Sequence, residues 1–318
     1  MRERWNKLKY WFRECIVLPL VIVTSGWIYV KNKYPSVPGR LYVMIYQGIG
    51  DIIVSMGYLG AYLERHEGEF QEIYLILVKR NKQVYAMYPP PGQEQKYRYI
   101  ILTQREYQFF CVYHETPIGF KSINARNDFL FIHTYNFIKD NWNYFYRMPG
   151  MTFMYFIKRG IYGLDDNAAF TYPRVMELAK QSRDNLDESY ALRREKVIIL
   201  NPYANTIFGE VPDDFWRYLA ARLCEDGYSV YTDCGKGDKE VVPGTKAITV
   251  SLKELNYICK HIEGYIGLRS GLLDYILFAG CKVIAIYPGE VGRDGNEVFQ
   301  AFDINGINQL MDTPINTN

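Results

Sequence analysis

The sequence is poor in the residues that metal and redox sites usually require. Its 318 residues include four histidines, with no HExxH motif and no paired spacing, so catalysis through imidazole-bound metal is not expected. The six cysteines lie far apart and form no CxxC pair, which argues against the common zinc and redox motifs. Most of them stand in apolar runs, and we interpret them as small core residues of a protein in a reducing compartment.

A strong excess of one charge is also lacking. The 37 Lys and Arg residues against 35 Asp and Glu give a formal net charge of +2, whereas nucleic-acid binders concentrate basic charge. Nucleic acid is therefore not an expected partner. Aromatic residues are abundant instead, with 29 Tyr and 17 Phe. Tyrosine rings suit sugar stacking, but coding bias and ordinary packing explain the same count, and both interpretations stay open.

The N-terminal segment, residues 1–38, combines a basic start with an apolar run over 15–30. That run falls just short of the ~17–25 residues that span a bilayer, and no small-residue cleavage site marks a signal peptide. Basic and aromatic residues interleave over 2–13, which favours a helix lying on an anionic membrane surface. We expect a membrane-associating segment. A true span and a helix buried on the protein's own body are the alternatives.

Beyond this segment, apolar runs alternate with amphipathic ones, which indicates an α/β fold with parallel sheets. Ser251 with Glu254 three residues on predicts a capped helix. We expect two Rossmann-like domains facing each other across a cleft, with domains over 39–190 and 191–318. Strands are predicted at 41–46, 72–78, 97–103, 128–135, 196–201, 228–235, 246–251, 263–268 and 281–289, and helices at 51–66, 212–227, 251–262, 272–280 and 296–311.

The first strand leads into a glycine turn that ends in a carboxylate, Gly48-Ile49-Gly50-Asp51. A dinucleotide fingerprint needs a third glycine where Ile53 stands, and an acid after the second strand, where basic residues follow instead. A dinucleotide site is therefore poorly supported. Asp51 is a candidate catalytic base, and an ordinary helix N-cap is the alternative.

Two further motifs fall at the carboxyl ends of predicted strands, where parallel sheets bind ligands. In "NPYANTIFGE" (201–210), a small-residue turn follows the strand and suits a phosphate or a ribose. In "GLRSGLLDYI" (267–276), free N–H groups, a hydroxyl and a guanidinium come together, which suits a diphosphate. For Arg269, a surface salt bridge is the alternative.

Together, these motifs resemble the GT-B glycosyltransferases and are most similar to glycosyltransferase family 9, the ADP-heptose:lipopolysaccharide heptosyltransferases. "GIGDIIVSMGYLGAYL" matches the family's GD turn, and "NPYANTIFGEVPDDFWRYLAARL" matches the turn and helix that open its second domain. "GLRSGLLDYILFAGCKVIAIYP" aligns with its D-[ST]-G-x-x-H turn, with Arg269 in place of the acid and Asp274 in place of the histidine. An RSGL turn is also similar to fucosyltransferase-like and capsule-associated enzymes. Heptose and ADP specificity therefore do not follow.

The resemblance implies an acceptor domain over 39–190 and a nucleotide-sugar domain over 191–318, with a final helix returning to the first. It implies an inverting, metal-independent transfer from a nucleotide-diphosphate sugar to a glycan or lipid-linked glycan, in lipopolysaccharide or capsule synthesis at the cytoplasmic face of the inner membrane. Two alternatives remain: a non-catalytic glycan-binding or scaffold protein, and an NAD(P)-dependent enzyme that modifies sugar nucleotides. The implied site consists of Asp51 as the base and, for the donor, Gly48, Gly50, Asn201, Tyr203, Ala204, Arg269, Ser270, Gly271 and Asp274.

Overall fold

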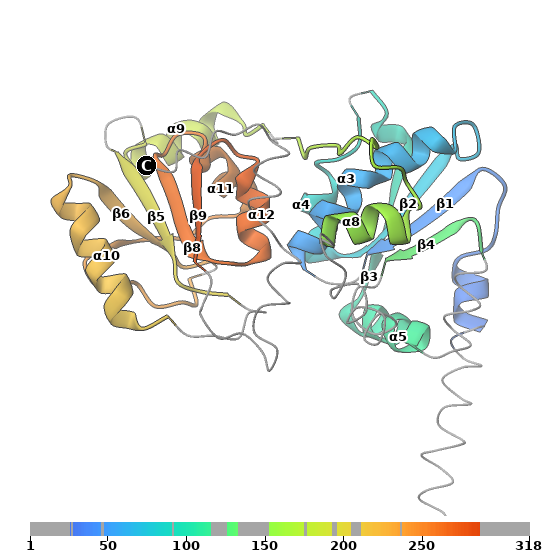
Figure 1. Ribbon diagram of the computed structural model, residues 1–318, viewed down its shortest axis with the longest axis horizontal. Coiled ribbons are helices and arrows are strands. Elements are labelled where there is room, and N and C mark those ends of the chain that lie inside the picture. Colours follow the sequence, from blue (N-terminus) through green and yellow to red (C-terminus); the bar gives the residue numbers. More distant parts are fainter. Residues whose placement is uncertain are drawn as a thin grey trace, which may run out of the picture. The chain divides into compact units, whose positions relative to one another are not determined.

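The computed structural model describes most of the chain between residues 26 and 286 (Figure 1). The described residues are 26, 28–45, 48–90, 92–115, 126–132, 153–174, 177–192, 196–204, 211–235 and 237–286. Most of the predicted membrane-associating segment and the predicted helix at 296–311 lie outside them. Within the described residues, no helix is both long enough and apolar enough to cross a bilayer.

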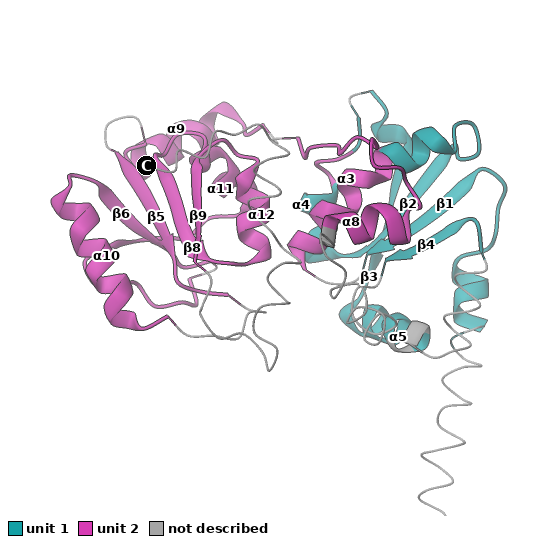
Figure 2. Cartoon of the chain, in the orientation of Figure 1, with its two compact units in different colours: residues 1–47, 61–85, 89–143 teal, residues 48–60, 86–88, 144–318 magenta. Residues whose placement is uncertain are grey.

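The chain divides into two compact units, coloured separately in Figure 2. Unit 1 comprises Met1–Gln47, Ala61–Tyr85 and Pro89–Asn143, and unit 2 comprises Gly48–Gly60, Ala86–Tyr88 and Tyr144–Asn318. Helix α3 (Ile49–Arg65) contributes its first turns to unit 2 and its last turn to unit 1.

Unit 1 is built on a four-stranded sheet in the order β3-β2-β1-β4, and every neighbouring pair is parallel. All four strands were predicted, and their bounds agree closely where the structure describes them. Residues 133–135, the end of the predicted fourth strand, lie outside the described part. The elements are β1 (Arg40–Ile45), β2 (Glu72–Val78), α4 (Lys82–Tyr85), β3 (Tyr97–Leu102), α5 (Gln104–Glu115) and β4 (Phe129–Ile132).

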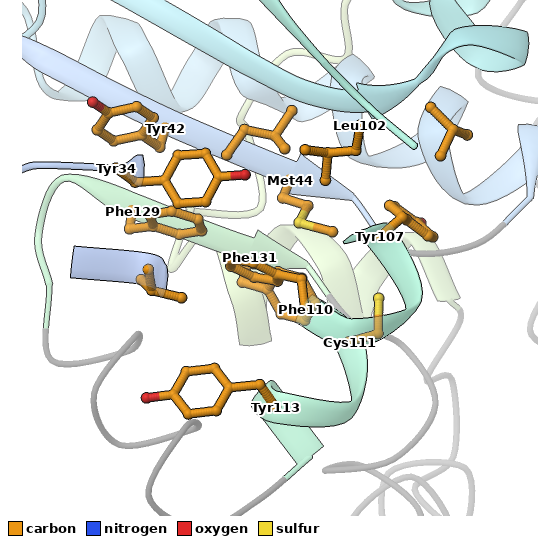
Figure 3. Packing of buried hydrophobic residues seen from close by; sticks show 13 residues of the cluster. Tyr34, Tyr42, Met44, Leu102, Tyr107, Phe110, Cys111, Tyr113, Phe129 and Phe131 are labelled. Carbon is orange, nitrogen blue, oxygen red and sulfur yellow. The ribbon is translucent and has the colours of Figure 1, made fainter. Parts of the chain in front are cut away.

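Aromatic rings fill the core of unit 1 between the sheet and α5 (Figure 3). The buried Tyr34 ring packs edge-on against Tyr42, Phe110 and Phe129, with ring centroids 5.6, 5.8 and 5.7 Å away. Such pairs contribute ~0.5–1.5 kcal/mol each beyond their buried area. These aromatic residues therefore have a structural role, in agreement with the packing interpretation of the composition.

Helix α5 begins with a reciprocal cap that also carries an ion pair. Glu106 accepts hydrogen bonds from the N–H and hydroxyl of Thr103, at 2.8 and 2.9 Å, and from Lys33 Nζ at 2.6 Å. The bond from Lys33, followed by those from Thr103, lowers the pKa of Glu106 from 4.5 to about 2. The ionised carboxylate therefore stabilises the folded state above about pH 4.5, and this contribution is lost as pH falls towards 2.

Glu106→Gln is expected to lower the free energy of unfolding by about 1 kcal/mol at neutral pH, a modest value because both side chains are about one-third exposed. Glutamine keeps the capping geometry, so the change isolates the charge. Urea unfolding of both proteins across the acid range measures the difference. It should shrink as pH falls from about 4.5 to about 2, and a constant difference would contradict the assignment.

Unit 2 holds a five-stranded sheet in the order β7-β6-β5-β8-β9, again entirely parallel. Trp216 and Ala220 of α10 are buried against its strands. Ser251 and Glu254 form the predicted capping box at the start of α11. The elements are α8 (Phe153–Tyr155), α9 (Lys180–Ser189), β5 (Val197–Asn201), α10 (Asp213–Glu225), β6 (Ser229–Asp233), β7 (Lys246–Ile248), α11 (Leu252–Cys259), β8 (Gly264–Leu268), α12 (Gly271–Leu277) and β9 (Lys282–Ile286).

Within unit 2, the first part of α3 packs through glycines. A Cβ atom at Gly57 would overlap the Phe170 ring, and one at Gly60 would lie 2.8 Å from Thr171 Oγ1. The missing side chains let the backbone at Thr171 approach, and its N–H donates to Gly57 O at 2.7 Å. Gly50, Gly57 and Gly60 lie on one face of the helix, since their spacings of seven and three residues follow the helical repeat.

Candidate active site

The strand order of unit 2 changes direction at β5, whose neighbours are β6 and β8. In open parallel sheets, ligands bind beyond the carboxyl ends of the strands at such a switch point. Two predicted segments lie there. Asn201, Tyr203 and Ala204 follow or end β5, while Arg269, Ser270 and Gly271 follow β8. The topology therefore brings the second and third motifs to one edge of one sheet.

The first motif meets the third through two glycines, both in unit 2. A Cβ atom on Gly271 would lie 2.6 Å from Gly50 N, and one on Gly50 would overlap Asp274 Oδ2. Neither glycine can be replaced without displacing a neighbour. The group that approaches the Gly50 backbone in the structure is the turn after β8.

Arg269 and Asp274 form a buried ion pair at this contact. Arg269 Nη2 lies 2.8 Å from Asp274 Oδ1 and 3.1 Å from Oδ2, and Nη1 donates to Ser270 O at 2.6 Å. The side chains are only 2% and 0% exposed. Burial raises the pKa of Asp274, and Arg269 opposes this rise. Arg269 thus forms a salt bridge, as the alternative proposed, but a buried one rather than one at the surface. Its predicted contact with a diphosphate stays a prediction.

Ser270 precedes α12 but does not cap it with its side chain. Its Oγ is buried and has no hydrogen-bond partner among the described residues. Buried hydroxyls are usually bonded, so the unsatisfied Ser270 hydroxyl is an exception that calls for an explanation.

Asp51 lies in the first turn of α3, three residues after Gly48. Its Oδ2 accepts a hydrogen bond from Gly48 N at 3.0 Å. The helix begins at Ile49, so Gly48 occupies the N-cap position and Asp51 does not. Like the acid of a capping box, it reaches back to the start of the helix. The side chain is half-buried. A carboxylate is therefore held at a glycine turn beside Gly271.

The turn after β5 is tied to the neighbouring strands by buried polar groups. Asn201 is 2% exposed, and its Oδ1 accepts from Tyr203 N at 3.1 Å. Tyr265, in β8, donates to Asp233 Oδ2 at 2.6 Å, and Asp233 Oδ1 accepts from Gly235 N at 2.9 Å. Burial, then the charge of Asp233, raises the pKa of Tyr265. This network joins the carboxyl ends of β5 and β6 to Tyr265, near the start of β8.

Sequence reasoning missed a cation at the same edge. Lys239 Nζ lies 4.9 Å from the centroid of the Tyr203 ring, and the Tyr203 hydroxyl donates to Glu240 O. The loop that carries Lys239 follows β6 and turns through Gly235 and Gly237, both with positive φ. The signal was present as "DCGKGDKE", a glycine- and lysine-rich stretch directly after a predicted strand. Tyr203 and Lys239 together form an aromatic and cationic surface beside β5.

The predicted site residues thus fall into two groups within unit 2. Gly48, Gly50, Asp51, Arg269, Ser270, Gly271 and Asp274 gather where α3 begins, and Asn201, Tyr203 and Ala204 occupy the neighbouring strand end. Their roles in binding or catalysis stay predictions. Among the described residues, no group of three or more His, Cys, Asp or Glu side chains could hold a metal ion.

No protein-family model and no curated protein sequence matches this chain. Solved structures do match. A glycosyl transferase family 9 protein from Veillonella parvula has a TM-score of 0.50 at 16% identity, covering 80% of this chain and 83% of that one. E. coli ADP-heptose lipopolysaccharide heptosyltransferase II has a TM-score of 0.49 at 12% identity, covering 78% and 84%. E. coli heptosyltransferase WaaC with ADP has a TM-score of 0.45 at 13% identity, covering 86% and 97%.

Of these three, the Veillonella structure has the highest TM-score, and at its low identity it establishes the fold alone. The chain is an α/β protein with two parallel sheets and a glycosyltransferase-like fold. The predicted resemblance to glycosyltransferase family 9 is confirmed at the level of the fold.

Proposed function

We propose that the protein is a glycosyltransferase that moves a sugar from a nucleotide-diphosphate sugar to a hydroxyl of a glycan. The observation that carries the proposal is the carboxylate of Asp51, held at a glycine turn against the turn that follows β8. The likeness in fold to a family 9 glycosyltransferase supports it. Fold alone does not fix function, so the assignment rests on the site.

Sugar transfer to a hydroxyl requires a base near the acceptor. A sugar hydroxyl is a weak nucleophile, and a carboxylate that accepts its proton during attack accelerates transfer. In the proposed step, the acceptor oxygen bonds to the anomeric carbon of the donor while the bond from that carbon to the phosphate oxygen breaks. The proton passes to Asp51, and the nucleoside diphosphate leaves. Attack from the face opposite the leaving group inverts the anomeric configuration.

The leaving diphosphate gains negative charge that polar groups must meet. We assign this role to Lys239 and the Ser270 hydroxyl, both at the carboxyl edge of the unit 2 sheet. The Tyr203 ring is proposed to stack on the nucleobase or the sugar. These assignments require no metal ion. Arg269 holds the turn that carries Ser270.

The acceptor is proposed to be a glycan or lipid-linked glycan of lipopolysaccharide or capsule synthesis, met at the cytoplasmic face of the inner membrane. The basic and aromatic residues of the N-terminal sequence support this proposal. The transferred sugar is proposed to be a hexose or a heptose. The exchange of two family residues for Arg269 and Asp274 gives no reason to favour heptose.

The proposal is tested with the full-length protein and a panel of UDP-, GDP-, ADP-, CMP- and dTDP-sugars, with NAD as a further ligand, by ligand-observed NMR. Selective binding of one nucleotide sugar, followed by its turnover with a glycan acceptor, is the expected result. Binding of NAD alone would replace the proposal with the oxidoreductase alternative. Glycan binding without turnover of any donor would favour the scaffold alternative.

Lys239→Ala is expected to weaken donor binding about 10–100-fold, because a hydrogen bond to a charged group contributes roughly 1.5–3 kcal/mol. Isothermal titration with the donor identified by the panel measures the change. Lys246 provides the matched control, since its Nζ also lies over a tyrosine ring, Tyr231, at 5.6 Å. Lys246→Ala should leave the donor Kd unchanged, and equal effects from the two changes would contradict a role for Lys239 at the site.

A further inference from the structure

The buried pair of Arg269 and Asp274 joins the turn after β8 to the helix that follows it, α12. Arg269 is the first residue after β8, and Asp274 lies within α12. The guanidinium is directed at the Asp274 carboxylate and at Ser270 O, all within 3.1 Å. A planar, forked donor can hold a carboxylate and a carbonyl at the same time, which the point charge of lysine cannot.

Asp274 in turn contacts the start of α3. Its Oδ2 occupies the space that a side chain at Gly50 would need, and Gly271 lies against Gly50 N and Ile49 N. A carboxylate at this place faces the positive end of a 17-residue helix, which attracts an anion. Burial, and then the charge of Asp274, raises the pKa of Tyr88. The Tyr88 hydroxyl donates to Ile53 O, in the next turn of α3, at 2.9 Å.

Asp51 belongs to that same first turn, because its carboxylate accepts the Gly48 N–H. A chain of direct contacts therefore runs from Arg269 through Asp274 and Gly50 to Asp51. We propose that Arg269 and Asp274 are positioning residues, which fix the first turn of α3 and with it the Asp51 carboxylate. The expected effect on turnover rests on the proposed function, whereas the expected effect on the first turn of α3 does not.

Two neutralising changes made together test the inference. Arg269→Gln with Asp274→Asn removes both charges, keeps a polar side chain at each position, and leaves no unpaired buried ion. The matched control is Arg222→Gln with Glu225→Gln, which neutralises an ion pair of 2.7 Å on α10 whose side chains are 54% and 62% exposed. Arg269→Lys, which keeps the charge and loses the fork, is the conservative variant.

Three readouts are taken on the folded proteins: donor Kd, kcat, and hydrogen exchange at the Ile52 amide, which donates to Gly48 O at 3.2 Å in the first turn of α3. The neutral pair should lower kcat at least about tenfold with the donor Kd within about threefold, since misplacing a catalytic group costs turnover rather than binding. The Ile52 amide should exchange about tenfold faster. Arg269→Lys should retain more of the kcat than the neutral pair, and the control pair should change nothing.

The outcomes separate the inference from the proposed function. Loss of thermal stability in the neutral pair, with kcat per folded molecule and amide exchange both unchanged, would overturn positioning and leave a structural ion pair. If the wild-type protein turns over no donor, the proposed function fails. Exchange of the Ile52 amide then still decides whether the pair holds the first turn of α3.

Discussion

Asp51→Asn is expected to lower kcat by about 10²–10⁴-fold, the range that general-base catalysis contributes. The asparagine carbonyl can still accept the Gly48 N–H that Asp51 Oδ2 accepts at 3.0 Å, so the start of α3 should keep its geometry. An amide, however, cannot take a proton from the acceptor hydroxyl. The donor Kd should stay within about threefold of wild type, because the base acts on the acceptor side of the reaction.

The matched control for this change is Glu64→Gln, which neutralises an exposed acid on the same helix. It should leave both kcat and the donor Kd unchanged. Steady-state kinetics with the donor and acceptor that the binding panel identifies, together with titration of the donor, give both quantities. If Asp51→Asn abolished donor binding but left turnover per bound donor intact, Asp51 would be a binding residue and the assigned base would be wrong.

Much of the fold could be predicted because local pattern determines it. The apolar runs at 72–78 and 197–201 coincide with buried parallel strands, since strands covered on both faces carry few polar residues. Ser251 and Glu254 predicted the start of α11 because a capping box involves only neighbours in sequence. Helix α3 was predicted to begin at Asp51, but it begins two residues earlier, at Ile49.

The residues of the candidate site could be predicted from the sequence, but most of the contacts between them could not. Gly50 and Gly271 lie far apart in the chain, and their mutual fit follows from tertiary packing that no local pattern encodes. The pairing of Arg269 with Asp274 was missed for a related reason. Their spacing of five residues crosses from a turn into a helix, where the usual i, i+4 rule does not apply. Lys239 was missed because a lone lysine in a loop usually faces only solvent.

The tyrosines illustrate a further limit of composition. Tyr85 and Tyr107, both buried, direct their hydroxyls at Ile45 O, the last residue of β1, at 3.5 and 3.1 Å. These hydrogen bonds satisfy the backbone carbonyl at the end of β1, inside unit 1. Tyr203, by contrast, is half-buried at the sheet edge of unit 2 beside Lys239. The total count cannot separate these two uses, whereas position in the fold does.

Gly50→Ala is expected to lower kcat about 100-fold, because the new methyl group would overlap Asp274 Oδ2 and push the first turn of α3 away from the turn after β8. Overpacking of this kind also costs about 1–3 kcal/mol of stability. The loss of stability alone does not identify a site, so the informative comparison is with a second glycine of the same helix.

Gly57→Ala supplies that comparison. Its methyl group would overlap the Phe170 ring, two turns further along the same face of α3 and away from Asp51. Both variants should unfold at lower urea concentration by similar amounts, while kcat per folded molecule falls only for Gly50→Ala. Equal kcat losses would mean that any disturbance of α3 impairs turnover. Unchanged kcat in Gly50→Ala would mean that the contact with Asp274 has no part in placing the base.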